Sequence, residues 1–159
     1  MAEPKSELIL QNVDQALLAI DGNAPFYNAI GENNYRRANV VLTDTDQGPY
    51  PFIAVAVTGA SLQGDTSAGA DTNVFEEMEI EVGCWIGSQT NVHRDLRRAE
   101  ADIRHALWLD PYRGGLAHNT WWTQTELLYP LNNEDHALVV VHFTIPYEVT
   151  LSDLTATTP

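Results

Sequence analysis

Three glutamates at alternate positions are the first side chains in this chain that could do chemistry. In a strand, Glu77, Glu79 and Glu81 would share one face. Carboxylate oxygens are the ligands that hard cations such as Ca²⁺ and Mg²⁺ prefer. Same-face side chains lie roughly 7 Å apart along a strand, too far for one ion without ligands from a neighbouring strand. The spacing therefore favours a solvated strand face over a metal site.

The other titratable side chains form no familiar catalytic pattern. The five histidines include no HExxH pair or other close pair of ligands: His93, His105, His118, His136 and His142. Asp102 stands three residues before His105, a spacing that favours a local hydrogen bond over a catalytic dyad. Cys84 is the only cysteine and alternates with apolar residues, so we expect a buried thiol with a raised pKa. We expect no enzyme activity, no metal and no cofactor.

A polar segment at residues 59–73 has the length of a functional loop. Its glycines follow neither GxGxxG nor GxxxxGK order, and phosphate would meet Asp65 and Asp71 where cations are needed. We expect a projecting loop that is either mobile or ordered by contact with another subunit. Its candidate contact residues are Leu62, Asp65, Asp71 and Asn73.

The composition is that of one globular, strongly acidic domain. The chain has 159 residues, with 22 acidic residues against 8 Lys plus Arg and a formal net charge of −14. This charge repels phosphate and argues against ordinary binding of nucleic acid or anionic membranes. No apolar run approaches the roughly 20 residues that cross a bilayer, and the N-terminus has no apolar signal core. We expect residence in a reducing cytosol and no membrane partner.

These residues must be positioned by a sheet and two helices. The periodicity predicts, in chain order, a helix at 7–20, a hairpin of strands at 38–42 and 51–58, a strand at 75–86, a helix at about 91–109 capped by Thr90 or Asn91, strands at 120–129 and 137–150, and a flexible tail at 151–159. We therefore expect an α+β domain over residues 1–159, with a mostly antiparallel sheet of four to five strands flanked by two α-helices.

Opposite charges are concentrated on two of these elements. The second helix carries four of the eight cations, and the strand before it carries the three glutamates. Trp121 and Trp122 would place one indole on each face of their strand, so one of them is either a partly exposed core residue or an interface anchor. The candidate residues for a subunit interface are Glu77, Glu79, Glu81, Arg94, Arg97, Arg98, Arg104 and Trp122.

The element order resembles the tail terminator proteins of long-tailed bacteriophages, also described as tail completion or minor tail proteins. The segments that carry the likeness are the helix at 7–20, YPFIAVAVTG from Tyr50, FEEMEIEVGCWIG from Phe75, NVHRDLRRAEADIRHALWLD from Asn91, and ALVVVHFTIPYEVT from Ala137. The likeness covers residues 7–150. It rests on the order of the elements and on the general pattern of polar and apolar residues within them.

The resemblance implies a structural virion protein of the tail–neck region, made in the host cytoplasm. Such proteins form a homohexameric ring that caps the tail tube, stops its polymerisation and docks the head or neck. The implied partners are further copies of the chain, the tail tube protein and a neck or head-completion protein, with DNA only passing through an acidic lumen. Residues 59–73 would contact the tube or line the lumen. The alternatives are a neck or head-to-tail joining (connector) protein of similar fold, and a small acidic ligand- or metal-binding domain.

Overall fold

The computed structural model describes residues 3–39, 41, 49–63, 73–87, 91–130 and 136–150. Within these residues the elements are α1 (Lys5–Leu18), a 3-10 turn (Glu32–Asn34), β1 (Tyr35–Arg37), β2 (Phe52–Gln63), β3 (Asn73–Gly87), α2 (Val92–Trp108), β4 (Trp121–Leu128) and β5 (His136–Thr150). They form two α-helices and a mostly antiparallel five-stranded sheet, which confirms the predicted α+β fold.

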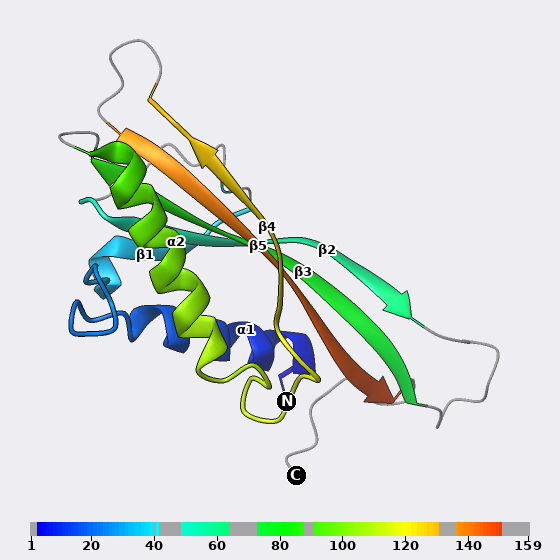
Figure 1. The fold of residues 1–159 in the computed structure, drawn as a ribbon. Coiled ribbons are helices and arrows are strands. Elements are labelled where there is room, and N and C mark those ends of the chain that lie inside the picture. The colour runs from blue at the N-terminus through cyan, green and yellow to red at the C-terminus, as the bar shows by residue number, and fades with distance from the viewer. Residues whose placement is uncertain are drawn as a thin grey trace.

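The sheet has the strand order β1-β2-β3-β5-β4. Its centre is the long antiparallel pair of β3 and β5, which runs from Asn73 opposite Thr150 to Gly87 opposite His136. β2 pairs with β3 and β4 pairs with β5, both antiparallel, whereas β1 runs parallel to β2. Figure 1 shows β2, β3 and β5 continuing past the helices toward the lower right.

Both helices lie against one face of the sheet (Figure 1). Their apolar stripes pack on alternate residues of β3 and β5 and form the main core. The most deeply buried helix residues include Ile9, Val13, Leu17, Leu96 and Ile103. α2 begins as predicted, because the Asn91 side chain accepts a hydrogen bond from the Arg94 backbone nitrogen at 3.1 Å.

A smaller apolar cluster covers part of the opposite face, which we call the outer face. It consists of Val41, Phe52, Ala54, Ala56, Trp85, Leu138 and Val140. Val41 sits directly over Gly83, where a Cβ would lie 2.1 Å from the Val41 Cγ1 atom. The start of β2 is therefore covered on both sides, as its continuous apolar pattern predicted.

The predicted strand at 38–42 and its hairpin are wrong. β1 lies at Tyr35–Arg37, pairs in parallel with β2, and is followed by residues that are not in a strand where they are described. Polar contacts with α1 favour this placement: Tyr35 donates a hydrogen bond to Asp14, and Arg37 binds both Asp14 and Glu7. The apolar side chain of Val41 covers the sheet instead of extending it.

The predicted loop at 59–73 is also shorter than expected. β2 continues through Gln63 and β3 begins at Asn73, so residues 59–63 and 73 belong to strands. The long partner strand satisfies their backbone hydrogen bonds even though Gly59 and Ser61 have low strand propensity. A register shift between Val57 and Gly59 accommodates one extra residue. Asp65, Asp71 and the tail at 151–159 lie outside the described residues.

A buried arginine holds the C-terminal end of α2. The Arg113 guanidinium donates hydrogen bonds to the carbonyl oxygens of Leu107 and Asp110, so it satisfies carbonyls that the helix leaves without partners. Burial lowers the pKa of this guanidinium. Arg113 has a positive φ of 51° and precedes Gly114 and Gly115, which also have positive φ. This turn leads the chain from α2 back to β4.

Candidate functional site

The outer face of β3 carries an exposed acidic strip. Phe75, Glu77 and Glu79 alternate with residues that face the helices, and Phe75 and Glu79 are exposed while Glu77 is half-buried. The β2 partners of the two glutamates are small, with Ser61 opposite Glu77 and Gly59 opposite Glu79. Because these neighbours are short, the two carboxylates remain open to a partner. We call Phe75, Glu77 and Glu79 the acidic arm.

Glu81 does not belong to this exposed strip, although the alternation predicted that it would. It is 7% exposed, and its Oε1 atom accepts a hydrogen bond from the Val41 backbone nitrogen at 3.4 Å. The Val41 side chain belongs to the apolar cluster that covers the outer face at this level of the sheet. Glu81 is thus a buried carboxylate rather than a candidate for direct contact with another molecule.

Cys84 lies on the helix side of the same strand, as predicted. Its side chain is buried in the main core. Burial, together with the nearby negative charge of Asp102, raises the pKa of the thiol to about 12. A thiol with this pKa is almost fully protonated near neutral pH and is a poor nucleophile.

More carboxylates lie on the outer face of the neighbouring strands. Glu148 stands opposite Phe75 on β5, and Glu126 on β4 is 2.9 Å from the Nε2 atom of His142. Glu148 is 3.7 Å from the Nε2 atom of His118. The outer face therefore presents negative charge from three strands.

The solvent side of α2 carries the opposite charge. Arg94, Arg97 and Arg98 are exposed and line a shallow groove of about 440 Å³ with Tyr27 and His93. The Arg98 guanidinium lies 5.1 Å from the centre of the Tyr27 ring, within range of a cation–π contact. The sheet separates this surface from the acidic arm, so the two cannot pair within one subunit.

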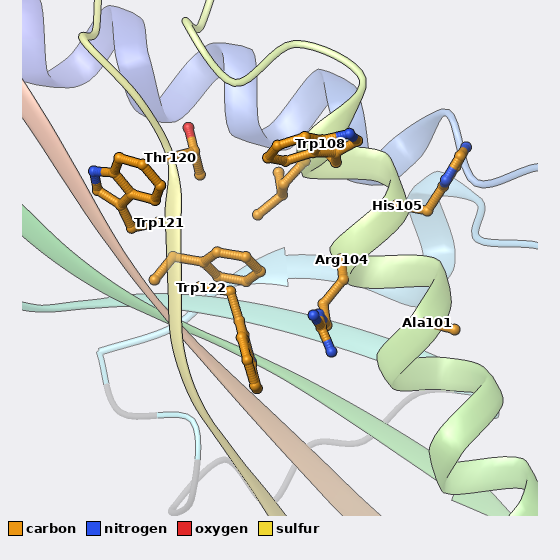
Figure 2. A pocket seen from close by; sticks show the side chains of 9 residues that line it. Ala101, Arg104, His105, Trp108, Thr120, Trp121 and Trp122 are labelled. Atoms are coloured by element: carbon orange, nitrogen blue, oxygen red, sulfur yellow. The ribbon is translucent and has the colours of Figure 1, made fainter.

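A second groove, of about 500 Å³, lies between α2 and β4. Figure 2 shows Arg104 and Trp108 on the helix facing Trp122 on the strand, with Trp121 on the other side of that strand. The Arg104 Cζ atom is 3.9 Å from the Trp122 ring centre, and the Trp122 indole nitrogen donates to Thr125 Oγ1 at 2.9 Å. We call Arg104, Trp108, Trp121 and Trp122 the tryptophan groove.

The sequence identified Arg104 and Trp122 separately, and the structure brings them into contact. It also adds Trp108, which sequence reasoning missed. The available signal was spacing, because Trp108 follows Arg104 by four residues and so lies on the same face of the helix. Trp121 and Trp122 are 54% and 46% exposed, so neither indole is a core residue.

The expected hydrogen bond between Asp102 and His105 is not formed. Both Asp102 carboxylate oxygens accept hydrogen bonds from Tyr27 and Asn28, in the loop after α1. The His105 ring packs edge-on against Phe26 instead, with ring centres 5.5 Å apart. Asp102 and His105 therefore both hold this loop in place against α2.

Across the described ranges, no group of three His, Cys, Asp or Glu side chains could hold a metal ion. Among the same residues, no helix combines the length and the apolar character needed to cross a bilayer.

Comparison with known proteins adds no family. No protein-family model matches the chain, and no curated protein matches it.

Proposed function

We propose that this protein is a structural subunit of a phage tail terminator: a homohexameric ring that caps the tail tube, stops its polymerisation and docks the neck. The observation that carries the proposal is the separation of charge between the acidic outer face of the sheet and the arginine-bearing side of α2. A closed ring is built from one contact repeated head to tail, which requires two different surfaces that match each other.

The charges favour such a head-to-tail contact. Two copies that meet through the same surface would place arginines against arginines or carboxylates against carboxylates, which is unfavourable. An acidic face against an arginine face is attractive and also fixes the order of subunits. Because the net charge is −14, much negative charge would remain on the ring surface, and it would keep passing DNA from sticking to the lumen.

The end of the β2–β3 hairpin is the part we assign to the tube or the lumen. Leu62 is 46% exposed there and Asn73, the first residue of β3, is exposed. An exposed apolar side chain beyond the helices offers contact area to a stacked ring. The partners in this proposal are further copies of the chain, the tail tube protein and a neck or head-completion protein.

Negative-stain microscopy of the purified protein, alone and with its tail tube protein, tests the proposal. We expect rings, and tubes of fixed length that end in a cap. Rings that bind a neck protein but leave tube length unrestricted would identify a connector and overturn the terminator proposal. Absence of both rings and tube binding would also overturn it.

A charge-matched pair of variants tests whether the arginine side of α2 builds the ring. Arg97→Gln with Arg98→Gln removes two positive charges from that surface, and we expect it to abolish most rings. Gln15→Glu with Asn33→Asp changes the net charge by the same amount at exposed positions on α1 and the 3-10 turn. This control should assemble normally, because the effect depends on the surface and not on the total charge.

A further inference from the structure

The tryptophan groove is an open aromatic surface next to an arginine. Trp108, Trp121 and Trp122 are 66%, 54% and 46% exposed. Leu109 and Tyr112, which follow α2 directly, are 65% and 57% exposed. Tryptophan is the side chain most enriched where one protein anchors another, and contiguous exposed apolar area marks interaction sites.

Arg104 gives this groove a positive charge that is only partly neutralised within the subunit. Its nearest carboxylate is that of Glu100, at 3.4 Å, which also accepts a hydrogen bond from Thr125. The Arg104 side chain is 44% exposed, and it stacks on Trp122. A guanidinium that contacts an indole through its face keeps N–H donors available to an incoming carboxylate.

The acidic arm has the complementary chemistry. Phe75 is 47% exposed and lies on the same face as Glu77 and Glu79. Its ring packs against His118, with ring centres 5.2 Å apart, and about half of the side chain remains exposed. One aromatic side chain followed by two carboxylates at alternate positions matches an aromatic groove with an adjacent arginine. Figure 1 places this end of β3 beyond the helices, where a neighbour can reach it.

We propose that the tryptophan groove of one subunit binds the acidic arm of a second copy, with Phe75 entering the groove and Glu77 or Glu79 pairing with Arg104. This inference rests on the proposed ring and extends its contact along α2, because Ala101 lines both the tryptophan groove and the groove of Arg94, Arg97 and Arg98. Arg104, Trp108 and Trp122 lie on the helix-covered side of the sheet and the arm lies on the outer face, so these three side chains meet an arm only between copies. Repetition of this contact is head to tail and leaves neither surface unpaired in a closed ring.

Cysteine cross-linking between two different variants tests the contact directly. Cys84 is buried with a raised pKa, so an introduced exposed cysteine is the reactive thiol in each variant. One variant carries Glu79→Cys in the arm, and the other carries Ala101→Cys in the groove wall. Under mild oxidation, the mixture should give at least tenfold more covalent dimer than either variant alone. Gln15→Cys mixed with Ala101→Cys is the control and should give only background.

The outcomes separate the contact from the ring. Rings seen by microscopy without cross-linking in the mixture would overturn this contact and leave the ring proposal standing. Equal cross-linking in the separate variants would show a symmetric contact and would also overturn the inference. If neither rings nor cross-linked dimers form, the inference and the proposed function both fail.

A second readout measures the apolar anchor without cysteines. Phe75→Ser should raise the protein concentration needed for ring assembly at least tenfold, and circular dichroism should show an unchanged fold. Leu128→Ser is the matched control, because Leu128 is 39% exposed and lies outside both grooves and the arm. Equal effects of the two substitutions would show that Phe75 has no special role in assembly.

Discussion

The Asp102 carboxylate accepts two hydrogen bonds from Asn28, one from its backbone nitrogen at 2.9 Å and one from its side-chain amide at 2.7 Å. The Tyr27 backbone nitrogen donates a third, also at 2.9 Å. Asp102 is buried on α2, so these bonds fasten the loop after α1 to the second helix. Tyr27 in turn lies under Arg98, which links this loop to the arginine side of α2.

Replacement of Asp102 should therefore destabilise the fold. Asp102→Ala leaves the loop nitrogens without an acceptor, and we expect the free energy of unfolding to fall by about 3 kcal/mol. Asp102→Asn keeps one acceptor oxygen and should lose roughly half as much. Urea denaturation followed by circular dichroism measures both. Losses below about 0.5 kcal/mol in both variants would contradict the structural role.

Gly83 should tolerate no side chain while Val41 is present. A Cβ at Gly83 would lie 2.1 Å from the Val41 Cγ1 atom, so Gly83→Ala forces either β3 or the Val41 side chain to move. We expect a loss of about 2 kcal/mol for Gly83→Ala and about 1 kcal/mol for Val41→Ala. The double variant should lose less than the sum, since the smaller residue at 41 makes room. Strictly additive losses in denaturation experiments would rule out this contact.

The link between β1 and α1 depends on Arg37. Its guanidinium lies 2.9 Å from Glu7 and 2.6 Å from Asp14, and its side chain is 38% exposed. Because solvent screens partly exposed pairs, we expect Arg37→Ala to cost only about 1 kcal/mol, and less at high salt. Arg94→Ala, which removes one exposed pair with Asp95, should cost at most a few tenths of that amount. Similar losses for the two variants would argue against a specific tether.

Cys84 should make stability depend on pH above the ordinary thiol range. Its pKa is raised from 9.0 to about 12 by burial, so between these values the native state keeps a proton that the unfolded state loses. The associated stability is fully present below about pH 9 and then falls by about 1.4 kcal/mol per pH unit. Denaturation of wild type and Cys84→Ala across this range isolates the thiol, since the tyrosines titrate in both. Parallel pH profiles would contradict the assignment.

The parts of the fold that the sequence predicted well are those with unbroken periodicity. α2, β3 and β5 begin and end within about two residues of expectation, because alternation and helical stripes there extend over many positions. The strand expected at 38–42 failed for a tertiary reason. Val41 has the side chain of a strand residue, but Gly83 on a distant strand offers it a site to cover.

Local sequence patterns also fail to predict which residues of the candidate site are exposed and which are in contact. Glu79 and Glu81 are equivalent by alternation, but Val41 lies over the outer face beside Glu81, which is buried, whereas Glu79 is exposed. Arg104 and Trp122 were both candidates, but their contact depends on the pairing of β4 with β5 beside α2. Information of this kind is absent from local patterns, because it is set by which elements become neighbours.

The central pair of strands also constrains when the protein can fold. β3 pairs with β5 along its whole length, and Asn73 meets Thr150, 77 positions later in the chain. During synthesis, the apolar faces of β2 and β3 therefore remain exposed until most of the remaining chain has been made, because the partner strand β5 comes last. Such long-range pairing is slow and exposes aggregation-prone surface in the interval. Chaperone demand in the producing cell should thus be highest just before β5 is made, and shortened nascent chains that lack it should be insoluble.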